Sequence, residues 1–174
     1  YQGLRAHGLG IDAARAAALL GRALLAQGRA AEAESLSHES EALGGDDLKA
    51  AIAWRGVRAE ALALRGDAET AVELARAAVT IASATDAFLD HADARMALAT
   101  ALRAASRATE ADAEEERAVE LWETKGATLL TGRIYAARPG VALARGDAGR
   151  VPPTVPTPHH VRENAATAIG IRLQ

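Results

Sequence analysis

Apolar residues recur at three- and four-residue steps along most of the chain as far as residue 126, which is the spacing of one buried face on an α-helix. In the stretch after Gly66 the apolar positions are Ala71, Leu74, Ala75, Ala78, Ile81 and Ala82, and the polar positions Glu69, Glu73 and Arg76 fall on the other side. We expect an all-α protein. The runs predict three helical hairpins within residues 11–43, 48–84 and 87–124, with helices at 11–26, 30–43, 48–65, 68–84, 87–104 and 108–124.

The turns of these hairpins form an internal repeat. Gly28, Gly66 and Ser106 lie roughly 38 to 40 residues apart, and an alanine follows five residues after each of them. These alanines are Ala33, Ala71 and Ala111. A fixed period of this length is typical of an α-solenoid, in which antiparallel hairpins stack and bury one another's apolar faces.

Short acidic residues precede several of the predicted helices. Asp12, Asp67 and Asp86 are predicted as N-caps, because a carboxylate can accept hydrogen bonds from free amides at a helix start. Beyond the third hairpin the pattern breaks: Gly146 keeps the period as a fourth turn, but Pro139 interrupts the helix that should lead to it.

The repeat pattern divides the chain into four parts. Residues 1–10 form a leading segment, and residues 11–138 form the α-solenoid, including a capping helix at 127–138. Residues 139–160 are a Gly/Pro-rich linker, and residues 161–174 look like the truncated start of a further segment. We therefore interpret the chain as a piece of a longer protein.

The composition argues against several classes of function. No apolar run approaches the roughly 18 residues that a membrane span requires, and a net charge of −3 argues against a nucleic-acid partner, which attracts clustered basic side chains. The absence of cysteine excludes disulfides, thiolate zinc sites and a cysteine nucleophile. We expect a cytoplasmic protein that binds neither nucleic acid nor membrane directly.

Few residues suggest chemistry of their own. No phosphate-binding GxxxxGK[ST] loop occurs. His91 lies between Asp90 and Asp93, but residues one and two apart on a helix point to different faces, so we interpret His91 as a solvated or groove-lining residue and not as a metal ligand. The pair His159-His160 is interpreted as a surface feature of the linker.

The remaining candidates are also given structural interpretations. Glu114, Glu115 and Glu116 are predicted to form a solvated helix face, since acid–base catalysis needs a carboxylate in a concave site. Trp54 and Trp122 are predicted to be packing residues. We expect no catalytic residue, no cofactor and no metal site, and hence no enzyme activity in this chain.

The repeat resembles the tetratricopeptide repeat (TPR) family. Each hairpin carries residues at the family's spacings for packing positions, in the sets Leu20-Gly21, Leu24, Gly28 and Ala33; Ala59, Leu62, Gly66 and Ala71; and Leu98-Ala99, Leu102, Ser106 and Ala111. The period is longer than the standard 34 residues, the usual aromatics are missing, and Arg55 and Arg58 fall where packing residues are expected. The resemblance implies a right-handed solenoid whose leading helices line a groove that receives a peptide or a neighbouring domain. Carried over by spacing, the groove residues are Arg15, Arg22, Glu60, Asp93, Met96, Thr100 and Arg103.

A narrower resemblance concerns the phrases DLKAAIAWRGVRAEALALRGDAETAVELARAAV and HADARMALATALRAASRATEADAEEERAVELWETKG. They are similar to the C-terminal repeats of bacterial, mainly actinobacterial, signalling proteins that carry an adenylate/guanylate cyclase-type domain and an AAA-type ATPase domain. In that family a SnoaL-like domain can follow, and VRENAATAIGIRL resembles its lead-in. The resemblance implies an interaction or regulatory scaffold; alternatives are the sensor arm of a MalT-like helix-turn-helix regulator, a pure interdomain spacer, or an enzyme fragment.

Overall fold

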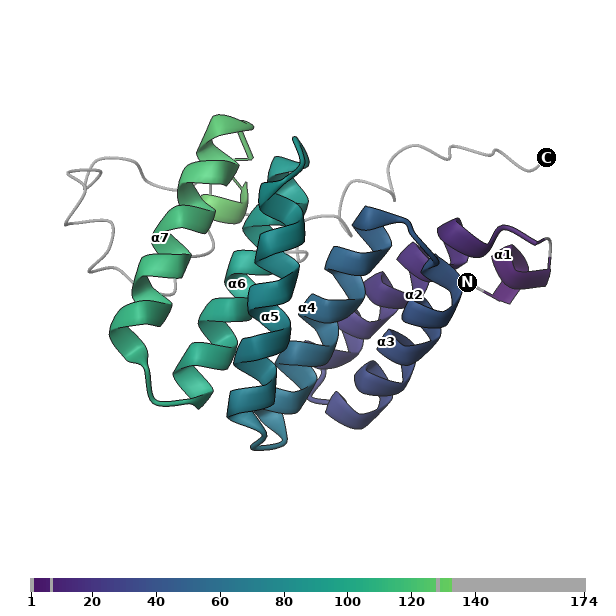
Figure 1. Cartoon of the computed structure of the whole chain (residues 1–174), viewed down its shortest axis with the longest axis horizontal. Helices are drawn as coiled ribbons and strands as arrows, with labels where there is room; N and C mark the ends of the chain where they lie inside the picture. The colour runs from purple at the N-terminus through teal and green to yellow at the C-terminus, as the bar shows by residue number, and fades with distance from the viewer. Residues whose placement is uncertain (1, 7, 128, 133–174) are drawn as a thin grey trace, which may run out of the picture. The chain divides into compact units, whose positions relative to one another are not determined.

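The computed structural model describes residues 2–6, 8–127 and 129–132. Within them every regular element is helical and no strand occurs, so the all-α prediction is confirmed. Figure 1 shows the helices in chain order. They are α1 (Gln2–Ala6), α2 (Gly10–Leu25), α3 (Ala30–Gly44), α4 (Leu48–Leu64), α5 (Ala68–Ser83), α6 (Phe88–Ala104) and α7 (Ala108–Thr124).

The six helices from α2 to α7 begin and end within about one residue of the bounds that apolar spacing predicts. Residues 129–132 are also helical, within the predicted capping helix at 127–138. The rest of that helix, the linker with His159-His160 and the segment 161–174 lie outside the described residues.

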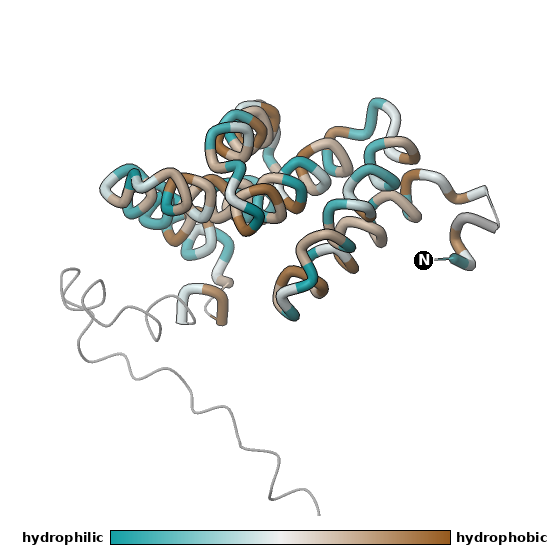
Figure 2. The backbone as a smooth tube through the Cα atoms, turned by 90° about the horizontal axis from the view of Figure 1, so that it is seen from below, coloured by the Kyte–Doolittle hydropathy of each residue, from teal (hydrophilic) through white to brown (hydrophobic). Residues whose placement is uncertain are grey.

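The helices pack in neighbouring pairs. We call α2 with α3 hairpin 1, α4 with α5 hairpin 2, and α6 with α7 hairpin 3, and we call the first helix of each the leading helix and the second the returning helix. Each leading helix also contacts the next leading helix, and α3 and α5 contact the leading helix that follows them. Figure 1 shows these helices side by side, and in Figure 2 apolar and polar positions alternate along their tubes. The inner face of the unit is therefore shared by α2, α4 and α6.

The three turns inside the hairpins have one geometry. Gly28, Gly66 and Ser106 all have positive φ, at 75°, 93° and 59°. In each turn the next amide donates to a carbonyl five residues earlier, in the pairs Arg29 to Leu24 (2.9 Å), Asp67 to Leu62 (3.0 Å) and Arg107 to Leu102 (2.8 Å). This pattern satisfies a carbonyl at the end of each leading helix, and it explains why the turn position favours glycine.

Ser106→Gly is expected to raise the free energy of unfolding by about 0.5 to 1 kcal/mol, because a residue with a Cβ is strained at this φ. Urea unfolding followed by circular dichroism measures the change. The control is Ala105→Gly, whose φ of −80° is available to any residue, so it should lower stability. A Ser106→Gly variant less stable than the parent would contradict the turn geometry.

The core is built from small residues at close helix separation. Ala33, Ala71 and Ala111, the alanines of the repeat, are fully buried. A Cβ added to Gly21 on α2 would lie 2.8 Å from Cγ1 of Val57 on α4, closer than real Cβ contacts. Glycine is therefore required where α2 and α4 approach each other.

The predicted N-caps are only partly right. Asp67 occupies the N-cap of α5, although its side chain makes no capping hydrogen bond. The prediction of Asp12 as an N-cap is wrong, because α2 begins earlier, after Leu9. The amide of Leu9 bonds to the carbonyl of Leu4, and Asp12 lies in the first turn of the helix. The prediction of Asp86 as the N-cap of α6 is also wrong.

The start of α6 explains the Asp86 error. The N-cap is Ala87, whose amide bonds to Oγ1 of Thr85 at 3.3 Å. The carbonyl of Asp86 accepts the amide of Phe88 at 3.0 Å, so this turn moves the helix start one residue along.

Candidate functional site

Three of the predicted groove residues, one from each leading helix, come together on the inner face. Nη1 of Arg22 on α2 donates to Oδ2 of Asp93 on α6 at 2.5 Å, although the two residues are 71 positions apart in the sequence. Glu60 of α4 interacts electrostatically with both of them. We call Arg22, Glu60 and Asp93 the inner-face triad. Its existence requires all three hairpins to be stacked.

Within the inner-face triad, the environment of Glu60 disfavours the ionised form of its carboxyl group. Burial raises the pKa of its carboxyl; the charge of Arg22 opposes the rise and the charge of Asp93 adds to it. The Arg22 guanidinium is bonded to Asp93, and no described residue donates a hydrogen bond to the Glu60 carboxylate. A cation approaching Glu60 would therefore be stabilised there.

Glu60→Gln is expected to stabilise the fold at neutral pH. Because the folded-state pKa of Glu60 is raised, the native state holds its proton to higher pH than the unfolded state, so ionisation of this group costs stability as pH rises above 4.5 through the folded-state pKa. The amide variant avoids that cost. Its advantage should be largest at pH 7 and should vanish below the unfolded pKa. Urea unfolding of both chains between pH 4 and pH 7.5 measures it.

The control for this prediction is Glu116→Gln on α7, where the parent side chain is exposed. Glu116→Gln should show no such pH-dependent gain. A Glu60→Gln chain that is less stable than the parent at pH 7 would show that Glu60 is not penalised by burial.

Arg15 ties hairpin 1 to the start of α4. Its Nη2 and Nε donate to Oδ2 and Oδ1 of Asp47 at 2.7 and 3.2 Å, and Asp47 also caps α4 by accepting the amide of Ala50 at 2.8 Å. Burial acts to raise the pKa of Asp47, but these hydrogen bonds and the charges of Arg15 and Lys49 hold it below its usual value. Arg15 is thus part of the structural framework beside the triad.

The other predicted groove residues do not join the triad. Oγ1 of Thr100 donates to the carbonyl of Met96 at 3.1 Å, one turn earlier on α6. Arg103 is directed to α7, where it bonds to Asp112 at 2.9 Å and to Glu115. Arg103 therefore bonds within hairpin 3.

The prediction of a solvated glutamate face on α7 is wrong for Glu114 and Glu115. Glu115 is only 8% exposed and pairs with Arg103, whereas Glu116 is exposed as predicted. Glu114 accepts from Nη1 of Arg95 at 2.5 Å and from Arg117. Arginines on α6 pair with these carboxylates, which allows the carboxylates to be buried between the two helices. The sequence signal for this burial was a pair of arginines eight residues apart on the facing helix, Arg95 and Arg103.

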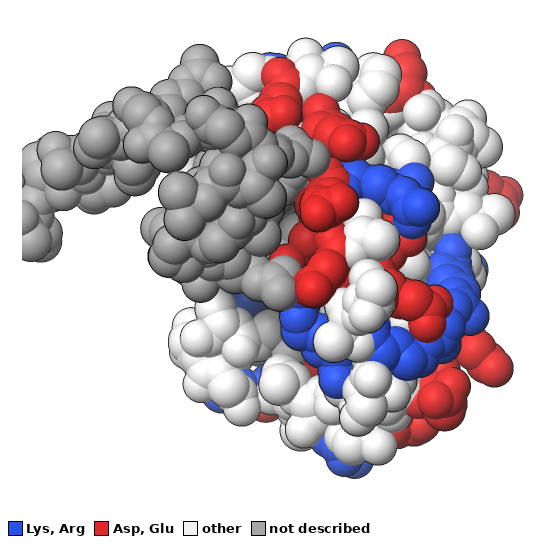
Figure 3. All heavy atoms as spheres, turned by 90° about the vertical axis from the view of Figure 1, so that its left-hand side faces the viewer, with Lys and Arg blue, Asp and Glu red and all other residues white. Residues whose placement is uncertain are grey.

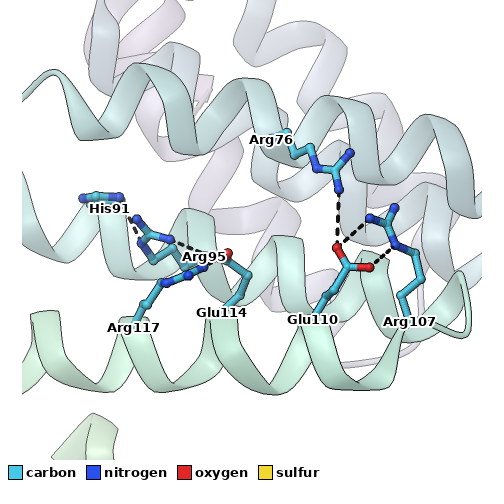
Figure 4. A network of polar contacts seen from close by, with 7 residues as sticks. All are labelled: Arg76, His91, Arg95, Arg107, Glu110, Glu114 and Arg117. Atoms are coloured by element: carbon cyan, nitrogen blue, oxygen red, sulfur yellow. Dashed lines mark hydrogen bonds and ion pairs between the residues drawn. The ribbon is translucent and has the colours of Figure 1, made fainter.

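Figure 4 shows this charged contact between α6 and α7 and a second one near the turn. In the second, Glu110 of α7 accepts from Arg107 at 2.6 and 2.7 Å and lies 3.8 Å from Arg76 of α5. Hairpins 2 and 3 are therefore also joined by charge on the outer side. These ion pairs connect neighbouring helices, so we assign them a structural role and take the inner-face triad as the candidate site.

His91 belongs to the charged contact between α6 and α7. Its Nε2 accepts from Nε of Arg95 at 3.1 Å, and burial together with the Arg95 charge lowers its pKa, so the imidazole is neutral at neutral pH. Beside it lies an open depression of about 290 Å³, lined by His91, Arg95, Arg117, Glu120, Leu121 and Thr124. Among the described residues no three acidic or histidine side chains form a group suited to a metal ion.

Both tryptophans are buried, as their interpretation as packing residues requires. The guanidinium carbons of Arg55 and Arg58 lie 4.0 and 4.4 Å from the centroid of the Trp54 ring. Arg58 also donates to Oγ of Ser37 at 3.0 Å on α3. Arg55 and Arg58 thus pack against an aromatic ring.

No helix in the described part of the chain has the length and apolar character needed to cross a lipid bilayer. No protein-family model matches the chain, and no curated protein matches it in sequence.

Proposed function

We propose that this chain is a non-catalytic, TPR-like segment that binds a protein partner through the inner face of its leading helices. One observation carries the proposal: Arg22, Glu60 and Asp93 come from three hairpins and meet on one face. Side chains that converge from distant parts of a sequence onto one surface are the usual basis of recognition by stacked repeats.

The chemistry of the inner-face triad favours a partner with a cationic side chain. Two carboxylates and one guanidinium leave the triad with an excess of negative charge when all are ionised. A lysine or arginine of the partner that reaches Glu60 would offset the burial of this carboxylate and lower its pKa. The partner is a peptide or a neighbouring domain of the parent protein.

Catalysis is not part of this proposal. The carboxylates of Glu114 and Glu115 are held in ion pairs by Arg95 and Arg103. The neutral His91 ring likewise accepts a hydrogen bond from Arg95. These groups stabilise the contact between α6 and α7.

An array of 15-residue peptides tests the proposal. The intact chain should bind a subset rich in lysine or arginine, and Glu60→Gln should weaken that binding at least tenfold, since hydrogen bonds to charged groups contribute roughly 1.5 to 3 kcal/mol. The matched variant Glu116→Gln, on the outer side of α7, should bind as the parent does. If no peptide bound, a pure interdomain spacer would be favoured, and equal binding by the two variants would show that the peptide does not bind at Glu60.

The host protein is proposed from the repeat's resemblance. We infer a cytoplasmic bacterial signalling protein with cyclase-type and AAA-type ATPase domains, in which the segment has a regulatory role. The genomic sequence that flanks the chain distinguishes this host from a MalT-like regulator. A cyclase or SnoaL-like domain supports the first, and a basic helix-turn-helix motif supports the second.

A further inference from the structure

The outward side of α2 carries an exposed apolar surface. Leu19 and Leu20 are 65% and 43% exposed, and Ala16 and Ala23 lie beside them on the same helix. We call these four residues the α2 surface. Exposed leucines at adjacent positions, flanked one turn away by alanines, are unusual on a helix face that meets only water.

The internal repeat shows what such a surface does elsewhere in this chain. Counted back from the turn, the α2 surface corresponds in α6 to Ala94, Ala97, Leu98 and Ala101, all buried. Hairpin 2 covers them: Ala94 packs with Ile52, Ala78 and Ala82, and Leu98 and Ala101 pack with Ala59, Val72 and Ala75. Three of the four residue types are identical between α2 and α6.

Hairpin 1 covers the corresponding positions of α4 in the same way. Val57 corresponds to Leu19, is fully buried, and packs against Ala18, Leu24 and Ala33. Arg58 corresponds to Leu20 and bonds to Ser37 of α3. In two leading helices out of three, therefore, this surface is the contact with a preceding hairpin.

The short helix α1 packs against α2 and ends in a turn of a type that recurs in this chain. It ends in a turn at Gly8, with φ of 72° and a bond of 3.0 Å from the amide of Leu9 to the carbonyl of Leu4. The returning helix α7 ends in the same way at Gly126, with φ of 69° and a bond of 2.8 Å from Ala127 to Trp122. α1 thus ends in the same type of turn as α7 and the leading helices, and the leading helix α2 follows it directly.

At the opposite end of the stack, the outer side of α7 is charged and not apolar. The outer side of α7 carries exposed charged residues, among them Glu116, Arg117, Glu120 and Glu123. Figure 3, seen from that side, shows acidic and basic side chains next to one another. A charged outer face is suited to water, in contrast to the apolar α2 surface.

We propose that the α2 surface binds a further hairpin of the same repeat, stacked on α2 as hairpin 2 stacks on α6. The occupant presents apolar residues toward Leu20 of the kind that Ala59, Val72 and Ala75 present to Leu98. This inference rests on the repeat geometry and does not depend on the function proposed for the inner face.

An extended chain tests the proposal. A second copy of residues 46–87 is placed directly before Gly10, in place of residues 1–9, so that the copied hairpin 2 meets α2 in the register in which it meets α6. We expect the midpoint of thermal unfolding to rise by about 5 °C, and amide exchange in α2 to slow. Leu19→Glu with Leu20→Glu should abolish the rise, whereas Leu64→Glu, at another exposed leucine, should leave it intact.

Three outcomes would overturn the proposal. The first is an extended chain whose added residues stay unfolded by circular dichroism, because α2 has then failed to bind a hairpin of its own repeat. The second is a rise that survives the double substitution. The third is a dimer of the 174-residue chain, seen by light scattering, that the double substitution converts to a monomer; the occupant is then a second copy.

Discussion

Leu102→Ala is expected to lower the free energy of unfolding by about 3 kcal/mol, within the range measured for buried leucines. Leu102 is 2% exposed and lies in the cluster that joins hairpins 2 and 3, among Ala59, Ala75 and Leu98. Most of its neighbours in this cluster are alanines, which have no rotamers with which to fill the space that the leucine leaves. The cavity should therefore persist and its full cost should appear.

Urea unfolding followed by circular dichroism measures this loss. Leu64→Ala is the matched control, because Leu64 is 60% exposed and its removal should change stability by less than about 0.5 kcal/mol. If the two variants lost equal stability, Leu102 would not be the centre of the contact between hairpins 2 and 3.

Glu114→Leu is expected to cost about 2 kcal/mol, although leucine is the residue found at this position in the other two hairpins. The substitution leaves the guanidinium of Arg95, whose side chain is 18% exposed, without its carboxylate. Arg95→Ala alone should cost less, about 1 kcal/mol, since Glu114 keeps its pair with Arg117.

Combining the two substitutions should restore most of the stability. The double variant carries the residues that hairpin 1 has at these positions, Ala17 and Leu36, so an apolar contact replaces the ion pair. We expect it to lie within about 1 kcal/mol of the parent, as replacement of whole buried ion pairs commonly does. Losses that add in the double variant would show that Arg95 and Glu114 act independently.

The apolar spacing and the turns were sufficient to predict the six long helices. Gly28 and Gly66 mark two turns, and Ser106 could be placed only because Ala111 follows it at the same offset as the alanines of the other repeats. The N-caps were harder to predict, since α2 begins after Leu9, three residues before Asp12, and α6 begins after Ala87, one residue beyond Asp86. Such shifts of a helix start are not visible in the pattern of residue types.

The candidate site was only partly predictable. Spacing placed Arg22, Glu60 and Asp93 on leading helices, but their meeting depends on how the hairpins stack, which lies outside a one-dimensional pattern. The burial of Glu115 was not predicted, because the run of glutamates on its own does not show that arginines of α6 face it. Arg103 and Arg95 sit on the facing helix and supply the charge that makes burial of a carboxylate tolerable.

A double-mutant cycle between Arg22 and Asp93 tests whether the three hairpins share an inner face. Stabilities are compared for Arg22→Ala, Asp93→Ala, the double variant and the parent by urea unfolding. The three-hairpin stack with a shared inner face predicts a coupling energy of about 1 kcal/mol between these residues, although they are 71 positions apart. Effects that add to within about 0.3 kcal/mol would mean that α2 and α6 do not meet over α4, and would contradict the inner face on which the function is proposed.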